Sequence, residues 1–191
     1  RFKKTVNAVW DNKTSILVGD ILFSQAFSLI IQARCFDILD CLSYAFNDIV
    51  MGEIRQLSYI PQKNLINKDV YYQIIGSKTA ALFAASCKVG GIMSKQSPET
   101  LKLLHDFGYK LGIAFQITDD VLDYSASSNL GKAIGDDFFE GKITLPIIML
   151  IEQANANDKI LIHKLFNAEK RQAQELEQIL TLLQSHMWIG Q

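Results

Sequence analysis

The chain has 191 residues, 49% of them hydrophobic, so it is long and apolar enough to bury the core of one ordinary domain. Its 19 Lys and Arg residues nearly balance its 20 Asp and Glu residues, which excludes the general basic surface that attracts nucleic acid. With only 3 Pro and 11 Gly and a mean hydropathy of +0.12, the sequence is neither collagen-like nor disordered. We therefore expect a folded domain without a nucleic-acid partner.

The cysteines and the N-terminal segment bear on where the protein resides. Three cysteines without the spacing of a zinc site or a disulfide framework are typical of a reducing compartment, so we expect a cytoplasmic protein. The most apolar stretch, residues 16–31, contains Asp20 and Gln25, and we therefore expect no transmembrane segment. The sequence opens with Arg1 and has no signal peptide, so we expect a piece of a longer protein.

Apolar residues recur three and four positions apart along most of the chain, which is the period of an α-helix. In chain order, this pattern predicts helices at about residues 16–31, 37–57, 69–93, 98–124, 145–154 and 158–185. Ser97 before Pro98 is a typical helix start, with Ser97 as the N-cap. Because sustained alternation of apolar and polar residues is absent, we predict one all-helical domain over residues 1–191. The longest connection, residues 125–144, is the kind of loop on which functional residues tend to lie.

Six carboxylates lie between residues 119 and 140, where basic residues are scarce. They are Asp119, Asp120, Asp123, Asp136, Asp137 and Glu140. On a helix, Asp119, Asp120 and Asp123 fall together with Gln116 within an arc of about 100°. Carboxylates so close repel one another, and hard oxygen ligands of this kind suit Mg²⁺ that is shared with substrate phosphates. The pattern therefore indicates a magnesium site at the three aspartates, with a solvated acidic patch as the alternative.

Basic residues around the acidic segment favour a phosphate ligand. Lys132 and Lys142 lie on the glycine-rich connection after the aspartates, where the backbone can approach a ligand closely. Lys78 and Thr79 interrupt an otherwise apolar helical run. A lysine there also has a plain structural interpretation, because its long stem can reach solvent over apolar neighbours. Only together do these residues favour a polyphosphate bound next to a metal ion.

The acidic segment and the residues after it resemble the trans-prenyl (polyprenyl) diphosphate synthase family. Phe115-Gln116-x-x-Asp119-Asp120-x-x-Asp123 resembles the family's second aspartate-rich motif. Gly131-Lys132 comes next, and residues 135–146, Gly-Asp-Asp-Phe-Phe-Glu-Gly-Lys-Ile-Thr-Leu-Pro, resemble the bacterial long-chain form of a later family segment.

Motifs upstream extend the resemblance to about residues 1–150. They occur in family order and are Gly19-Asp20, Gly52-Glu53 with Gln56, and Lys78-Thr79-Ala80. The resemblance implies an isoprenoid-synthase-type helical bundle that uses Mg²⁺ as its cofactor. It also implies two substrates, an allylic prenyl diphosphate and isopentenyl diphosphate. The allylic diphosphate ionises, isopentenyl diphosphate attacks the resulting cation through its double bond, and a proton is then lost.

The resemblance also implies a role for each matching residue. Asp119 and Asp123 would help to hold Mg²⁺, with Asp120 and Asp136 close by in support. Lys78 and Lys142 would be the catalytic residues, because they neutralise charge on the leaving diphosphate. The substrate diphosphates would be contacted by Arg1, Lys78, Thr79, Gln116, Lys132 and Lys142.

The sequence departs from the family pattern at its N-terminal end. The family carries a first aspartate-rich motif followed by paired arginines, and Arg1 resembles the second of these arginines. The first motif would then lie before residue 1, and the C-terminal helices are shorter than those of the family. We therefore expect a central to C-terminal portion of a synthase, truncated at both ends and inactive by itself.

Two rival functions remain open. The chain could be a catalytically incompetent subunit of a heteromeric synthase, which the missing first motif supports. It could also be another all-helical Mg²⁺-diphosphate enzyme, such as a terpene cyclase or a nucleotide pyrophosphohydrolase, although the expected metal motifs of both are absent. Family members are commonly homodimers, and the apolar stripe Phe23, Phe27, Ile30 and Ile31 suits a core or subunit contact. The long-chain motif favours a product that becomes a quinone side chain.

Overall fold

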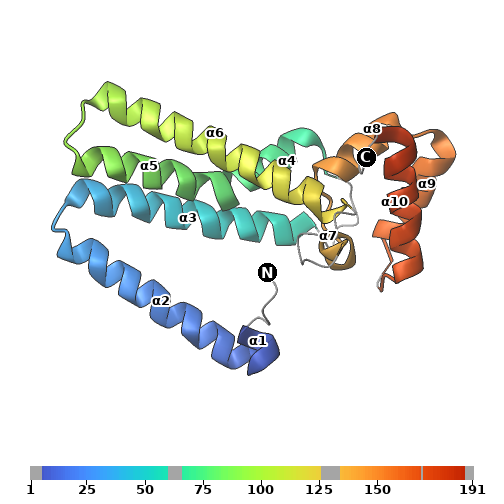
Figure 1. Ribbon diagram of the computed structural model, residues 1–191, viewed down its shortest axis with the longest axis horizontal. Helices are drawn as coiled ribbons and strands as arrows, with labels where there is room; N and C mark the ends of the chain where they lie inside the picture. The colour runs from blue at the N-terminus through green and yellow to red at the C-terminus, as the bar shows by residue number, and fades with distance from the viewer. Residues whose placement is uncertain (1–5, 60–65, 126–133, 169, 188–191) are drawn as a thin grey trace.

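The computed structural model describes residues 6–59, 66–125, 134–168 and 170–187, and these ranges contain helices and no strand (Figure 1). The prediction of an all-α fold is therefore confirmed. The elements, in chain order, are α1 (Val6–Val9), α2 (Asn12–Gln32), α3 (Phe36–Tyr59), α4 (Lys68–Ile75), the π-helical turn η1 (Gly76–Ala80), α5 (Ala81–Met93), α6 (Pro98–Asp123), α7 (Asp136–Glu140), α8 (Leu145–Gln153), α9 (Ala156–Phe166) and α10 (Ala173–Met187).

Polar side chains at the N-cap begin several of these helices. The Asp11 carboxylate accepts a hydrogen bond from the Thr14 N–H at 2.6 Å at the start of α2. Ser97 accepts from the Thr100 N–H at 3.3 Å at the start of α6, with Pro98 in the first turn, as predicted. Each cap satisfies a backbone donor that has no partner within its own helix, which fixes where that helix begins.

Helices α3, α5 and α6 lie side by side and form a long layer (Figure 1). Its helix α6 carries Asp119, Asp120 and Asp123. The single helix predicted at 69–93 is a continuous run of α4, η1 and α5. Its middle is a π-helical turn, in which the Ala81 N–H bonds to the Gly76 carbonyl five residues back. This turn thus accommodates one extra residue where Lys78 and Thr79 lie. Such π-turns are frequent at functional sites.

The C-terminal helices pack around a hydrophobic core of their own. Its largest fully buried side chains are Phe138, Ile147, Leu150, Ile162, Ile179 and Leu183. A smaller cluster joins α4 to α8 through Tyr71, Ile75, Leu145 and Ile148. These two clusters fix residues 134–144 against the long layer, and Lys142 lies among these residues.

The helix predicted over 158–185 is wrong in its extent, because α9 and α10 are separate. Arg171 lies between them and donates to the Phe166 carbonyl at 2.5 Å, which satisfies an acceptor at the end of α9. The predicted loop 125–144 likewise contains the short helix α7. Gly135 and Gly141 flank α7 with φ of 84° and 74°, a left-handed conformation that favours glycine.

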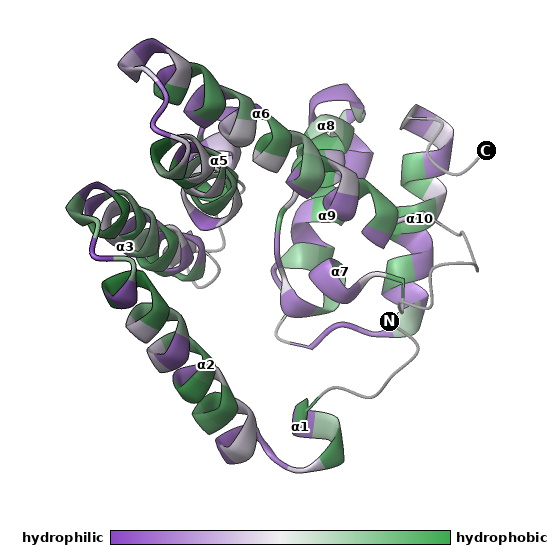
Figure 2. Cartoon of the chain, turned by 60° about the vertical axis from the view of Figure 1, so that its left-hand side comes forward, coloured by the Kyte–Doolittle hydropathy of each residue, from purple (hydrophilic) through white to green (hydrophobic). Residues whose placement is uncertain are grey.

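Helix α2 has no buried residue in the described structure and meets α3 mainly through the ring of Phe23, which lies 5.3 Å from that of Phe46. Figure 2 shows it as hydrophobic along most of its length. Among the described helices it is the one that is long and apolar enough to cross a membrane, with a mean hydropathy of 1.7 over an 18-residue stretch. Within α2, Asp20 is the sole charged residue after Lys13. The length and composition of α2 therefore do not bear out the expectation that the chain has no possible transmembrane segment.

Candidate active site

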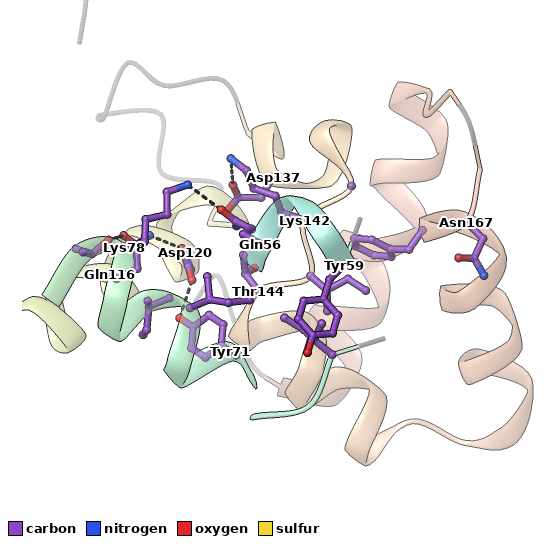
Figure 3. Close-up of a pocket in the computed structure, with 17 residues that line it drawn as sticks. Gln56, Tyr59, Tyr71, Lys78, Gln116, Asp120, Asp137, Lys142, Thr144 and Asn167 are labelled. Carbon is purple, nitrogen blue, oxygen red and sulfur yellow. Dashed lines mark hydrogen bonds and ion pairs between the residues drawn. The ribbon is translucent and has the colours of Figure 1, made fainter. Parts of the chain in front are cut away.

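A cavity of about 90 Å³ opens where α3, α4, η1 and α6 meet the segment between α7 and α8 (Figure 3). Five of the predicted site residues line it: Lys78, Thr79, Gln116, Asp120 and Lys142. They come from three separate parts of the chain, so the fold brings them together. The cavity is smaller than the roughly 300–1,000 Å³ of pockets that enclose whole ligands, and it suits a polar head group rather than an entire substrate.

The π-helical turn presents Lys78 and Thr79 to this cavity from the middle of a buried helix. Helix α3 passes so close that a side-chain carbon on Gly52 would lie 2.8 Å from the Lys78 backbone nitrogen. Only glycine permits this approach. The Gly52-Glu53 pair of the sequence therefore has a physical reason, because the glycine lets Glu53 and Gln56 reach the lysine of η1.

Lys78 is held by two side chains of α3. Its Nζ lies 2.6 Å from the Glu53 carboxylate. It also donates to the Gln56 Oε1 at 2.7 Å, a contact that Figure 3 shows. Glu53 and Gln56 occur in the family motifs, yet neither was predicted as a site residue, because a charge on a helix face is usually solvated. The ammonium group of Lys78 is therefore held at the mouth of the cavity, where an anionic ligand would compete with Glu53 for it.

A chain of hydrogen bonds crosses the cavity from η1 to α4. The Thr79 hydroxyl donates to the Gln116 Oε1 at 2.7 Å, and the Gln116 Nε2 donates to the Asp120 Oδ1 at 2.8 Å. The Tyr71 hydroxyl donates to the other oxygen of Asp120 at 2.6 Å. Burial raises the pKa of Asp120, although the donors Tyr71 and Gln116 oppose this shift. Burial and the adjacent Asp120 carboxylate also raise the pKa of Tyr71, which keeps the phenol protonated as a donor.

The three aspartates of α6 occupy unequal environments. Asp120 and Asp123 are buried, with 4% and 1% of their surface exposed, whereas Asp119 is half-buried. The Asp123 carboxylate accepts from the Asp137 N–H at 3.0 Å and so anchors the start of α7. Asp136, predicted in a supporting role, is half-buried in the first turn of α7. Helical geometry predicts that the three aspartates share one arc. In the structure Asp120 and Asp123 lie in the interior, whereas Asp119 lies nearer the surface.

Magnesium fits the chemistry of these residues, because hard carboxylate oxygens are its usual protein ligands. Within the described ranges, no three His, Cys, Asp or Glu side chains form a ready-made metal cluster. Mg²⁺ retains several waters and is commonly shared between one or two carboxylates and substrate phosphates, so a complete protein cage is not required. Asp119, Asp120 and Asp123 remain predicted ligands.

Lys142 reaches the cavity from the residues between α7 and α8, just after the left-handed Gly141. It forms an ion pair with Glu140, and its Nζ lies 3.7 Å from an Asp137 oxygen (Figure 3). Burial tends to lower the pKa of Lys142, but Glu140, Asp137 and Glu53 outweigh it and raise that pKa. A firmly charged lysine thus faces the cavity. The other predicted diphosphate contacts, Arg1 and Lys132, lie outside the described residues.

Tyr71 is another contributor to the cavity that sequence reasoning missed. It lies on α4, seven residues before Lys78, and seven residues are close to two helical turns. The pattern Tyr-x₆-Lys on one helix face was therefore a usable signal. It was hidden because a tyrosine within an apolar helix is ordinarily a core residue.

The arrangement of α3 to α6 around a cavity lined by two lysines, beside an aspartate-bearing helix, is that of an isoprenoid synthase. The family model of polyprenyl synthetases matches residues 1–183, and the chain belongs to that family. The decaprenyl diphosphate synthase structure from Rhodobacter capsulatus is 37% identical, with a TM-score of 0.86 over 98% of this chain and 58% of that one. The polyprenyl synthase of Caulobacter crescentus, solved with calcium and isoprenyl diphosphate, is 34% identical, with a TM-score of 0.87 over 94% of this chain and 55% of that one.

Curated relatives give the same family. The octaprenyl diphosphate synthase of Haemophilus influenzae is 37% identical over 190 residues, which are 97% of this chain and 56% of the relative. The octaprenyl diphosphate synthase of Escherichia coli is 42% identical over 149 residues, 78% of this chain and 46% of the relative. The chain therefore spans about half the length of the curated relatives it matches.

Proposed function

We propose that this chain supplies the allylic diphosphate site of a trans-polyprenyl diphosphate synthase. In the proposed reaction the carbon–oxygen bond of an allylic prenyl diphosphate breaks, and the diphosphate leaves with the electron pair. The double bond of isopentenyl diphosphate attacks the allylic cation, a carbon–carbon bond forms, and a proton is released. The names of the octaprenyl relatives support a long-chain product, and a quinone side chain is its proposed use.

The observation that carries this proposal is the convergence of Lys78, Thr79, Gln116 and Lys142 on one cavity beside the α6 aspartates. Two lysines from different parts of the chain would balance the negative charge that the diphosphate gains as the bond breaks. Thr79 and Gln116 would orient it through neutral hydrogen bonds. When bound, Mg²⁺ would act as a Lewis acid on the phosphate oxygens, held by Asp119 and Asp123 with Asp120 in support.

An apolar stripe on α6 supports a prenyl chain as the other part of the substrate. Leu103, Phe107, Leu111 and Phe115 are all exposed large apolar residues, and they recur at every fourth position. Residues at this spacing share one face of a helix. The stripe ends at Phe115, next to Gln116, and runs away from the diphosphate site for roughly 18 Å at the rise of an α-helix. We propose that it forms one wall for the growing chain and keeps water from the cation.

The exposed apolar surface of α2 supports an assembly with a second chain. A large unburied apolar surface on a soluble domain marks an interaction site, and we propose a second copy of this chain as the first partner. A heteromeric synthase is the second candidate. It is supported by a relative named heptaprenyl diphosphate synthase component 2, from Bacillus subtilis, which is 33% identical over 94% of this chain.

The test is the thermal stabilisation of the folded chain by Mg²⁺ together with a non-hydrolysable allylic thiodiphosphate. A ligand that binds only the native state raises the melting temperature by mass action. Asp119→Ala should abolish most of this increase. The matched control is Asp106→Ala, the same change on the same helix, more than three turns away, and it should preserve the increase. An unchanged increase of the melting temperature in Asp119→Ala would mean that the aspartate face is only a solvated acidic patch.

A further inference from the structure

Tyr71 combines deep burial with a polar contact to the acidic motif. Only 2% of its surface is exposed, its ring packs with Ile75, Leu145 and Ile148, and it lines the cavity. Its hydroxyl donates to the Asp120 carboxylate at 2.6 Å. The ring has the environment of a core residue, whereas the hydroxyl is directed at the site (Figure 3). The role of the hydroxyl is therefore separable from that of the ring.

The contact determines how the Gln116 amide is oriented. The Tyr71 hydroxyl donates a hydrogen bond to one oxygen of Asp120 and holds the carboxylate so that its other oxygen accepts from the Gln116 Nε2 at 2.8 Å. The amide oxygen of Gln116 then faces the Thr79 hydroxyl at 2.7 Å. The reverse orientation would place an amide oxygen against a carboxylate oxygen and is disfavoured.

Resting on the proposed function, we propose that Tyr71 is a positioning residue for the diphosphate, acting through Asp120 and Gln116. A glutamine amide has two N–H donors, and Asp120 engages one of them. The other remains for a phosphate oxygen in the cavity. Without the Tyr71 hydroxyl, Asp120 is free to rotate and Gln116 loses its fixed orientation. The cavity then keeps both lysines but loses its preorganised neutral donor.

The test measures the affinity of Mg²⁺ with inorganic diphosphate, by calorimetry, for wild type, Tyr71→Phe and Tyr72→Phe. Tyr71→Phe removes the hydroxyl and keeps the ring, and we expect about a tenfold loss of affinity, as for a hydrogen bond to a charged group. Tyr72→Phe is the matched control: the same change at the next position, 40% exposed and not part of the cavity wall, so affinity should be retained. The melting temperature of each variant is measured without ligand.

A double-mutant cycle with Gln116→Met separates positioning from general support of the fold. If Tyr71 acts through Gln116, Tyr71→Phe should change affinity less than about twofold in the Gln116→Met background, because linked residues are not additive. An independent tenfold loss in both backgrounds would overturn the positioning role. So would an unchanged affinity in Tyr71→Phe itself.

Two further outcomes keep the proposal falsifiable. If Tyr71→Phe does not fold, Gln116→Met alone still tests the hydrogen-bonded chain, and undiminished diphosphate affinity in that variant would overturn the proposal. If the wild type shows no Mg²⁺-dependent binding of diphosphate, the proposed function fails and this proposal fails with it. Binding by the wild type with no effect of Tyr71→Phe overturns the positioning role alone.

Discussion

The C-terminal cluster buries its apolar residues, whereas α2 and the long layer of helices leave many of theirs exposed. In α8, α9 and α10, residues such as Leu150, Ile162 and Leu183 are fully buried against one another. In α2 and α6, residues such as Leu22 and Phe107 are as apolar but remain exposed. Both regions are helical, so the helical period does not explain the difference. The cluster completes its own core, whereas α2 and the long layer present surfaces suited to another polypeptide or to a substrate chain.

The largest expected effect tests whether the long layer needs residues upstream of Arg1 for catalysis, whereas the C-terminal cluster needs none for its core. The 191 residues contain one Asp-Asp-x-x-Asp motif, and the family resemblance calls for a second motif facing it. We expect incorporation of radiolabelled isopentenyl diphosphate to be at least about a thousandfold slower than in a version extended upstream through that motif, because removing even one preorganised electrostatic contact costs about two to three decades. Comparable turnover by the two versions would contradict this expectation.

The second prediction tests the completeness of the C-terminal core with two changes in one helix. Ile162 is 0% exposed and Ile160 is 68% exposed, both in α9. Ile162→Ala should lower the free energy of unfolding by about 2 to 5 kcal/mol, because it removes buried methyl groups and leaves a cavity. Ile160→Ala should change it by less than about 0.5 kcal/mol. Urea unfolding of both variants measures the difference, and equal effects would mean that α9 is buried on both sides in solution.

The third prediction concerns the point where the two regions meet. Lys142 lies between α7 and α8, where the C-terminal cluster meets the long layer. A charged lysine does not ligate a metal ion. Lys142→Ala should therefore weaken diphosphate binding about tenfold, the scale of a hydrogen bond to a charged group, and leave Mg²⁺ binding nearly unchanged. Calorimetry with each ligand measures both affinities, with the exposed Lys102→Ala as control. Equal losses for diphosphate and Mg²⁺ would remove Lys142 from its proposed role.

The smallest effect on stability is expected on α2. Leu22→Glu places a charge on an exposed residue, so the free energy of unfolding of the separate chain should change by less than about 0.5 kcal/mol. If a second copy covers α2, the same change should shift the sedimenting species from dimer to monomer. Ser28→Glu, about 120° around the helix, serves as control. A dimer that survives both changes would place the subunit contact elsewhere.

Several features of the fold were predictable because they depend on local signals. Ser97 and Pro98 give the start of α6, and the periodic apolar residues give α3 and α8 nearly to their ends. The division between α9 and α10 was not predictable, because it depends on Arg171 reaching a carbonyl of the preceding helix. Helix α7 was missed because two glycines that are typical of a loop in fact delimit one turn.

The candidate site was partly predictable for the same reason. Lys78, Thr79, Gln116 and Lys142 stand in recognisable motifs, and the structure brings them to one cavity. The unequal burial of Asp120 and Asp123 was not predictable, because helical geometry gives the direction of a side chain but not what packs against it. Tyr71 was missed because its contact with Asp120 joins residues 49 positions apart.

The π-helical turn has a consequence for how this gene tolerates mutation. Since the Ala81 N–H bonds to the carbonyl of Gly76, the run from α4 to α5 holds one residue more than a regular helix needs. Deleting a single codon within the turn would leave an ordinary α-helix, and the helical runs on either side would keep their orientation. Tyr71 would still face Asp120 and Ala84 would still be packed in the core, but Lys78 and Thr79 would no longer both stand at their places on the cavity wall. An in-frame deletion of one residue in this turn should therefore spare the fold and damage the site.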